Sequence, residues 1–177
     1  MESTDAQLVE RLAAGDLSAL GPIHRRYGTP IASFLMRVEP TITAQDAEDL
    51  SQEVFLTFVD TVGRYEEQGQ LKSWLFGIAV GKARNWRRKR VLRWLTGKRH
   101  GADAAGVSLH QPATDERVAA RQRLHRALAQ LPGSQREVVT LHLIEGLSAK
   151  ETAEVLGISE NAVSIRVHRA RKALEGV

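Results

Sequence analysis

The chain has 177 residues, which is enough for two small helical domains but too few for a large enzyme core. It contains no cysteine, so disulfides, thiolate metal sites and cysteine nucleophiles are excluded. The net charge is only +4, and aromatic residues make up 5% of the chain. Good helix formers are abundant and runs of β-branched residues are few, which favours an all-α fold.

The first residues and the hydropathy of the sequence indicate where in the cell the protein is expected to act. The first seven residues are polar and partly acidic, without the apolar run of a secretory signal. No stretch approaches the roughly 18 apolar residues that a membrane-spanning helix requires. We therefore expect a cytoplasmic protein with no membrane insertion.

The N-terminal part of the sequence predicts a series of helices. Residues 4–7 have the pattern of a capping box, and the helix that they open is expected to end near Gly15. Pro30 and the glycine two residues before it interrupt the next apolar pattern, which predicts separate helices over 18–27 and 30–38. A further helix is expected to begin after a threonine cap and to carry an apolar stripe before it ends at Gly63.

Charge is sorted along the chain. Residues 40–67 contain seven acidic residues and one basic residue, whereas residues 68–102 contain ten basic residues and no acidic one. Trp74, Trp86 and Trp94 are interleaved with the basic residues. This block favours a polyanionic partner, usually nucleic acid. A solvated basic tail is the simpler alternative, but such a tail has no use for the aromatic side chains.

A long helix is expected from Leu71, with apolar residues on one face and Arg84, Arg87 and Arg88 on the other. Helical periodicity is lost over 96–114, where glycines accumulate as in a flexible linker. The predicted architecture has three parts: an N-terminal helical bundle over residues 1–95, the linker over 96–114, and a C-terminal helix-turn-helix domain over 115–177.

The C-terminal part predicts the helix-turn-helix in detail. Capping-box patterns begin at Ser134 and Ser148, and the short helix after Ser148 ends at Gly157, which suits the positive φ of a tight turn. In the last helix, a buried stripe repeats from Val163 to Leu174. A merely amphipathic terminal helix would not need this cap, turn and short helix. The opposite face can meet base edges and phosphates through Asn161, Ser164, Ile165, Arg166, His168, Arg169 and Lys172.

Three segments resemble the sigma-70 family of bacterial sigma factors. Residues 46–55 (DAEDLSQEVF) closely resemble the polymerase-binding segment, and residues 74–80 (WLFGIAV) resemble the helix that follows it. Residues 134–172 are similar to the C-terminal DNA-binding domain. The segments occur in the family's order with no room for a middle domain, so the sequence resembles the extracytoplasmic function (ECF) branch. The resemblance implies a factor that binds core RNA polymerase and directs promoter-specific initiation.

The resemblance also implies a role for each segment. The acidic helix would dock on the coiled coil of the polymerase beta-prime subunit through Asp46, Asp49, Gln52 and Glu53. The loop over 64–70 and the basic helix would recognise and melt the minus-10 element, with cations on the backbone and aromatic groups on an unstacked base. The C-terminal face would read the minus-35 element. The implied minus-10 residues are Arg64, Tyr65, Gln68, Lys82, Arg84, Asn85, Trp86, Arg87 and Arg88.

Further expectations also come from the resemblance. Many family members have Asn where this chain has Gly81, so one amide contact is missing and the minus-10 preference is expected to differ. Partners implied by the resemblance are the beta-prime and beta subunits, promoter DNA and an inhibitory anti-sigma factor. We expect no metal, no cofactor and no catalytic site.

Two alternatives use the same residues differently. A two-domain helix-turn-helix regulator without sigma activity would need the DNA-binding helix but not the acidic segment, and polymerase affinity separates these hypotheses. A metal-dependent nuclease or recombinase would use Asp46, Glu48, Asp49 and Glu53 as magnesium ligands beside a basic channel. A partner-facing acidic helix is far commoner, and DNA cleavage would reveal the nuclease. The six histidines have no paired metal spacing.

Overall fold

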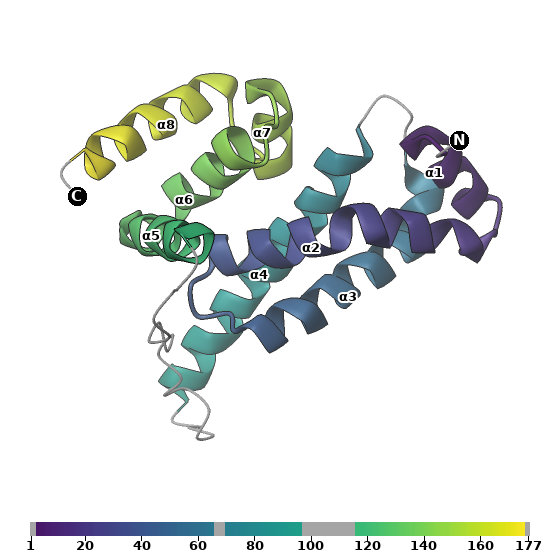
Figure 1. Cartoon of the computed structure of the whole chain (residues 1–177), viewed down its shortest axis with the longest axis horizontal. Helices are drawn as coiled ribbons and strands as arrows, with labels where there is room; N and C mark the ends of the chain where they lie inside the picture. Colours follow the sequence, from purple (N-terminus) through teal and green to yellow (C-terminus); the bar gives the residue numbers. More distant parts are fainter. Residues whose placement is uncertain (1–2, 66–69, 97–115, 176–177) are drawn as a thin grey trace.

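The computed structural model describes residues 3–65, 70–96 and 116–175, and every regular element in these ranges is helical (Figure 1). The first group of helices comprises α1 (Asp5–Ala13), α2 (Leu20–Val38), α3 (Ala44–Thr61) and α4 (Leu71–Leu95), with short 3₁₀ turns at Leu17–Ala19 and Val62–Arg64. The second group comprises α5 (Glu116–Gln130), α6 (Gly133–Val139), a π-helical continuation at Thr140–Ile144, α7 (Ala149–Leu156) and α8 (Glu160–Leu174).

The core of the first group lies between α2, α3 and α4. Phe34, Phe58 and Phe76, one from each helix, are fully buried. Phe34 and Phe76 meet edge to face, with ring centroids 5.0 Å apart and planes at 80°. Such a pair adds about 0.5–1.5 kcal/mol to the burial of its area. This core holds α3 and α4 side by side, so that the acidic and basic segments of the sequence become neighbours.

The predicted break within α2 is wrong. The expected helices over 18–27 and 30–38 form one helix that contains Pro30. Proline removes one backbone donor, but the apolar face continues across it, with Ile23 and Ile31 both fully buried. Burial against α3 and α4 therefore maintains the helix through a residue that ordinarily interrupts one.

Two of the three predicted capping boxes form: Thr4 caps α1 and Ser148 caps α7, each with a reciprocal side-chain bond from the third helical residue. The cap predicted at Thr43 also forms and proves to be a capping box, completed by Asp46. The box predicted at Ser134 is wrong, because α6 begins after Pro132 and has no side-chain cap. Glu137, the expected partner in that box, is instead buried and faces α4. A long-range ion pair replaces the local hydrogen bond.

The helix-turn-helix forms as predicted. Gly157 ends α7 with φ +67° and ψ +41°, the left-handed conformation that glycine adopts without strain. Ser159 then caps α8 by accepting a hydrogen bond from the backbone N–H of Ala162 at 3.2 Å. Ala153 and Val163 are buried where α7 and α8 meet. The opposite side of α8 faces away from this contact.

The second group of helices packs against one side of the first, with α7 on α4 and with α5 and α6 on α2 (Figure 1). Val138, Leu141 and Leu156 belong to the same continuous apolar cluster as Leu71 and Leu75. The predicted linker lies outside the described residues except for its first position. Within the described ranges, none of the helices has the length and apolar character needed to cross a bilayer.

Candidate protein and nucleic-acid interfaces

The exposed acidic face of α3 is the first candidate interface. Asp49, Gln52 and Glu53 are all exposed, and helical spacing puts them on one face. Glu53 Oε2 lies 3.2 Å from Lys82 Nζ, so its charge is partly balanced by α4. The fourth predicted residue, Asp46, is half-buried, and its Oδ2 accepts a hydrogen bond from the backbone N–H of the capping threonine at 3.1 Å. Asp46 therefore also stabilises the helix end.

Leu56 is a residue on this face that sequence reasoning missed. Its side chain is 65% exposed, although leucine is usually buried. It follows Glu53 by three positions and precedes Asp60 by four, so it lies among the carboxylates. Its departure from the buried stripe of α3 could have been recognised from the spacing. The face thus combines an apolar centre with acidic surroundings.

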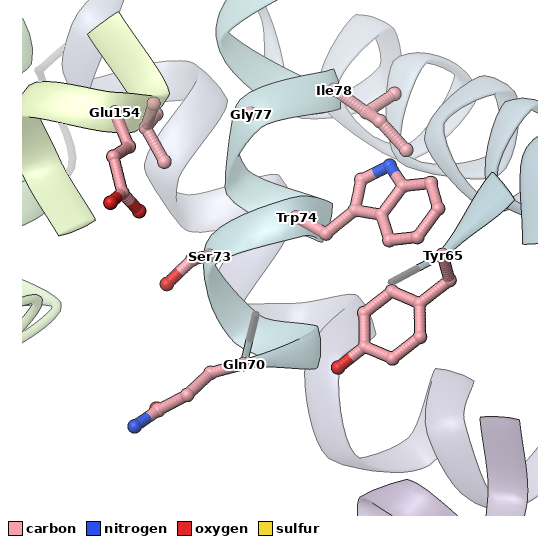
Figure 2. Close-up of a pocket in the computed structure, with 8 residues that line it drawn as sticks. Tyr65, Gln70, Ser73, Trp74, Gly77, Ile78 and Glu154 are labelled. Carbon is pink, nitrogen blue, oxygen red and sulfur yellow. The ribbon is translucent and has the colours of Figure 1, made fainter. Parts of the chain in front are cut away.

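A pocket at the start of α4 is the second candidate interface. The rings of Tyr65 and Trp74 are stacked, with centroids 4.7 Å apart and an interplanar angle of 14° (Figure 2). The pocket has a volume of about 450 Å³. Tyr65 belongs to the predicted site, whereas Trp74 was expected only among the interleaved aromatic residues and in the segment 74–80, without a role at the site. Gln68 falls outside the described residues, and Arg64 is exposed at the edge of this region. The remaining lining residues are Gln70, Ser73, Gly77, Ile78, Glu154 and Val155.

In the basic half of α4, one set of the predicted minus-10 residues faces α3. Lys82, Asn85 and Trp86 line a cavity of about 410 Å³, whose opposite wall includes Glu53. The Arg93 guanidinium lies 5.9 Å from the Trp86 ring centroid, within the range of a cation–π contact. The indole N–H of Trp86 is buried and has no hydrogen-bond partner among the described residues. This groove thus combines cations with an aromatic surface.

A second set of α4 cations faces α6. Arg84 donates two hydrogen bonds to the Glu137 carboxylate, from Nε at 3.2 Å and from Nη2 at 2.7 Å. Arg87 Nη2 lies 3.8 Å from the same carboxylate, whose side chain is only 6% exposed. The hydrogen bonds from Arg84 to Glu137 raise the pKa of the Arg84 guanidinium. As expected, Arg84, Arg87 and Arg88 lie outside the buried apolar face of α4, and Arg88 is exposed and donates to Asn85. Arg84 and Arg87 do not point freely outward, however, because both contact Glu137 of α6.

The third candidate interface is the outer face of α8. Val163 and Ala170 are buried on the packed side of α8. The polar residues lie on the opposite side, which faces away from the rest of the protein. Ile165 is 43% exposed between polar neighbours. Arg166 is half-buried, and no cation of α8 forms an ion pair with another residue in the described part of the chain. The other predicted residues are all exposed: Asn161, Ser164, His168, Arg169 and Lys172.

Comparison with known families matches both halves of this structure. A family model described as Sigma-70 region 2 matches residues 23–93, and one described as Sigma-70, region 4 matches residues 121–174. The RNA polymerase sigma factor CnrH of Cupriavidus metallidurans is 32% identical over 99% of this chain and 95% of its own length. This chain belongs to the sigma-70 family. Its function as a sigma factor is to bind core RNA polymerase and direct transcription initiation at specific promoters.

Further relatives identify the branch of the family. The ECF RNA polymerase sigma-E factor of Escherichia coli K12 is 28% identical over 97% of this sigma factor and 93% of its own length. The structure of CnrH in complex with the cytosolic domain of CnrY aligns with a TM-score of 0.72 at 26% identity, covering 97% of this chain and 95% of that one. RpoE in complex with the anti-sigma factor NepR from Bartonella quintana shares the fold, with a TM-score of 0.66 at 24% identity over 84% and 89% of the two chains. The protein is thus an ECF sigma factor, in preference to the regulator and nuclease alternatives.

Proposed function

We propose that this sigma factor uses the three candidate interfaces for three separate contacts in initiation. The acidic face of α3 docks on polymerase, the start and basic half of α4 hold the opened minus-10 strand, and α8 reads the minus-35 element. The observation that carries this assignment is the stacked pair of Tyr65 and Trp74 beside a basic helix, because single-stranded bases bind to such surfaces.

Polymerase docking would use charge and one apolar contact. Asp49 and Glu53 suit a basic partner surface, for which we propose the coiled coil of the beta-prime subunit. Leu56 is placed to be buried at the centre of this contact, where removal of its apolar surface from water would favour binding. We assign a further contact with the beta subunit on the basis of family membership.

Melting of the minus-10 element would depend on the pocket at Trp74. Each base stacked on an aromatic side chain contributes about 1–3 kcal/mol, which favours the separated strand over the duplex. Lys82 and Asn85 lie further along α4 and would hold the backbone of that strand. A side chain at Gly81 would meet no atom within 4 Å of its Cβ, so this position has room for the amide that many relatives carry. Its absence supports an altered minus-10 preference.

Recognition of the minus-35 element would place α8 in the major groove. Exposed Asn161 can reach base edges, and Arg169 can contact phosphates, as in other helix-turn-helix proteins. The exposed Ile165 is suited to apolar contact with a thymine methyl group.

We infer that the remaining partners are those of the ECF branch. One similar solved chain is bound to an anti-sigma factor, so we propose a protein inhibitor of that class for this chain. The proposed site of action is the cytoplasm, where polymerase and promoters are found. The protein would act by binding alone, without a catalytic step of its own.

Run-off transcription tests the proposal. Core polymerase from the source bacterium, supplied with this protein and a genomic promoter library, is expected to start at sites that share two sequence elements. Reversing charge with Asp49→Arg and Glu53→Arg is expected to lower polymerase binding about 100-fold or more and to abolish these start sites, because the carboxylates would be replaced by like charges.

The matched control changes the same charge elsewhere. Glu10→Arg with Glu175→Arg alters two exposed carboxylates outside the three interfaces and is expected to retain start-site selection. Circular dichroism checks that both double variants remain helical. Wild-type polymerase binding by the Asp49 and Glu53 variant would refute the docking assignment.

A further inference from the structure

The first helix, α1, has no part in the three interfaces proposed above, yet it is fixed to the first helix group at two places. Its inner face is apolar, and Leu8 and Leu12 are buried in the core. At its start, both carboxylate oxygens of Asp5 are engaged by α2. Tyr27 Oη donates a hydrogen bond to Asp5 Oδ2 at 2.5 Å, and the Arg26 guanidinium pairs with Oδ1. The beginning of α1 is thus held on α2 by charge-assisted contacts.

The same helix supports the turn that precedes Tyr65. Besides α2, α1 packs against the 3₁₀ turn at Val62–Arg64 and against α4, at the end of the bundle where α4 begins (Figure 1). Val62 is buried in this turn. The backbone N–H of Tyr65 donates to the carbonyl of Val62 at 3.0 Å, so Tyr65 is attached directly to the turn. A displacement of α1 would therefore be passed on to Tyr65.

The two rings of the stacked pair are supported differently. Trp74 lies within α4, and its ring meets that of the fully buried Phe58 edge to face, with centroids 6.1 Å apart and planes at 85°. Tyr65 lies outside any helix and is partly buried against the core cluster that includes Tyr27. Burial and the hydrogen bond to Asp5 raise the pKa of Tyr27, and the nearby Tyr65 raises it further. The position of Trp74 thus depends on its own helix, whereas that of Tyr65 depends on α1 and α2.

We propose that α1 is the positioning element for the base-stacking pair of Tyr65 and Trp74. The contact of Asp5 with Tyr27 clamps α1 on α2, and α1 in turn holds the 3₁₀ turn that carries Tyr65. Asp5 and Tyr27 are therefore positioning residues, which act on an opened base through Tyr65 and do not stack on it themselves. This inference rests on the proposed role of the pair in holding the minus-10 strand.

The expected consequence is a change in one step of initiation. A pair that is already stacked binds a base without the free-energy cost of ordering both side chains. When the clamp is lost, the pair is formed in only a fraction of the molecules, and the apparent affinity for the base falls by that fraction. Polymerase docking and minus-35 recognition use α3 and α8, so neither should change. The loss should therefore appear in promoter opening after the promoter is bound.

The first test is Asp5→Asn, which keeps the size of the side chain and removes its charge. Holoenzyme carrying this variant is supplied with a promoter identified by run-off transcription, and opening is followed with a fluorescent base analogue in the minus-10 region. At saturating promoter, Asp5→Asn is expected to slow opening by about three- to tenfold, because a hydrogen bond to a charged group is lost. The affinity for the closed duplex is expected to change by less than about 1.5-fold, since it depends on distant contacts.

The second readout reports on the pair without DNA. With Trp86→Phe and Trp94→Phe, Trp74 is the sole tryptophan of the chain, and its near-ultraviolet circular dichroism depends on its fixed contact with Tyr65. Asp5→Asn is expected to move this spectrum toward that of Tyr65→Ala in the same background. Urea unfolding is measured in parallel. A contact that only stabilised the fold would lower the urea midpoint and leave the native spectrum unchanged.

Asp16→Asn is the matched control. Asp16 pairs with Arg11 at 2.7 Å at the other end of α1, so this variant breaks a comparable ion pair away from the clamp. It is expected to leave opening and the spectrum unchanged. Tyr27→Phe removes only the hydroxyl group of the clamp and should change both readouts in the direction of Asp5→Asn. Because these two variants break the same hydrogen bond, their combination is expected to lose less than the sum of the single losses.

The outcomes distinguish this inference from the proposed function. Equal results for Asp5→Asn and Asp16→Asn would overturn the positioning role, as would an altered spectrum with unchanged opening. If Trp74→Ala slows opening and Asp5→Asn does not, only the positioning role is wrong. If neither variant slows opening, the stacked pair does not hold the strand, and the proposed function of this pocket fails as well. Slower opening with a shifted spectrum in both Asp5→Asn and Tyr27→Phe would support positioning by α1.

Discussion

The two helices proposed to meet promoter DNA, α4 and α8, are both basic but differ in how their cations are engaged. On α4, Lys82 pairs with Glu53 of α3, and Arg84 pairs with Glu137 of α6. On α8, no ion pair is present among the described residues, and most of the polar face is exposed. DNA would have to displace protein carboxylates from α4 but could approach α8 directly. Charge along a sequence therefore indicates a nucleic-acid surface without showing whether that surface is available.

Among substitutions in these two helices, the largest loss of promoter opening is expected at Trp74 of α4. Replacing Trp74 with Ala is expected to lower promoter opening by about 10- to 100-fold, because it removes a stacking surface worth about 1–3 kcal/mol per base. Opening can be followed by the fluorescence of a base analogue in the minus-10 region, with polymerase binding unchanged. Trp94→Ala is the control, since that side chain is 70% exposed at the other end of α4. Equal losses in both variants would contradict the pocket assignment, and Trp74→Phe should restore part of the opening.

Substitution on α8 is expected to have a smaller effect, measured as weaker binding of minus-35 DNA. Replacing Arg169 with Ala should weaken binding of a minus-35 duplex by the holoenzyme by about five- to tenfold, because one charge-assisted phosphate contact is lost. The slope of log affinity against log salt concentration should decrease by about 0.9, the value for one phosphate on duplex DNA. The same result is expected at Arg166 if it contacts phosphate. Arg121→Ala on exposed α5 serves as the control, and an unchanged slope at Arg169 would exclude a phosphate contact there.

The smallest predicted effect concerns the cap that begins the helix-turn-helix. Replacing Ser148 with Ala should lower the free energy of unfolding by about 1 kcal/mol at pH 7, the usual contribution of an N-cap. The hydrogen bond from the Ser148 side chain to Glu151 is the main reason that the pKa of this glutamate is lowered below 4.5. A lowered carboxylate pKa contributes stability above about pH 4.5 that is lost as the pH falls through the lowered value.

Urea unfolding measures this dependence. The stability difference between wild type and Ser148→Ala is expected to be larger at pH 7 than at pH 3.5. Ser134→Ala is the control, because Ser134 lies in a similar sequence pattern but caps no helix in the structure. A penalty at Ser134 equal to that at Ser148 would show that the effect does not come from capping. The paired variants also show whether the loss is specific to the helix-turn-helix.

Much of the fold and part of the candidate site could be predicted from local sequence patterns. The caps at Thr43 and Ser148, the left-handed turn at Gly157 and the exposed face of α8 all depend on residues within one or two turns of each other. Leu56 and Trp74 were missed, although helical spacing and the interleaved aromatic pattern contain the information that would have identified them. Their exposure and stacking became evident only once their neighbours in space were known.

Local patterns failed where distant residues compete with nearby ones. Pro30 does not end α2, because buried side chains on both sides of it pack against other helices. Glu137 does not complete a capping box with Ser134, because Arg84 and Arg87 supply stronger charge-assisted contacts in a largely buried site. In both cases, the sequence pattern was correctly recognised and the tertiary contact had the larger effect.

The sequence by itself determined that the chain is helical, where acidic and basic charges gather, and which face of each helix is polar, since these properties repeat over three or four residues. Only the tertiary structure decided which cations are engaged and which are available to a partner. Arg84 and Glu137 are 53 positions apart, and no local periodicity relates residues at that separation. Their pairing depends on how two helix groups pack, so the covering of α4 became visible only when both groups were seen together.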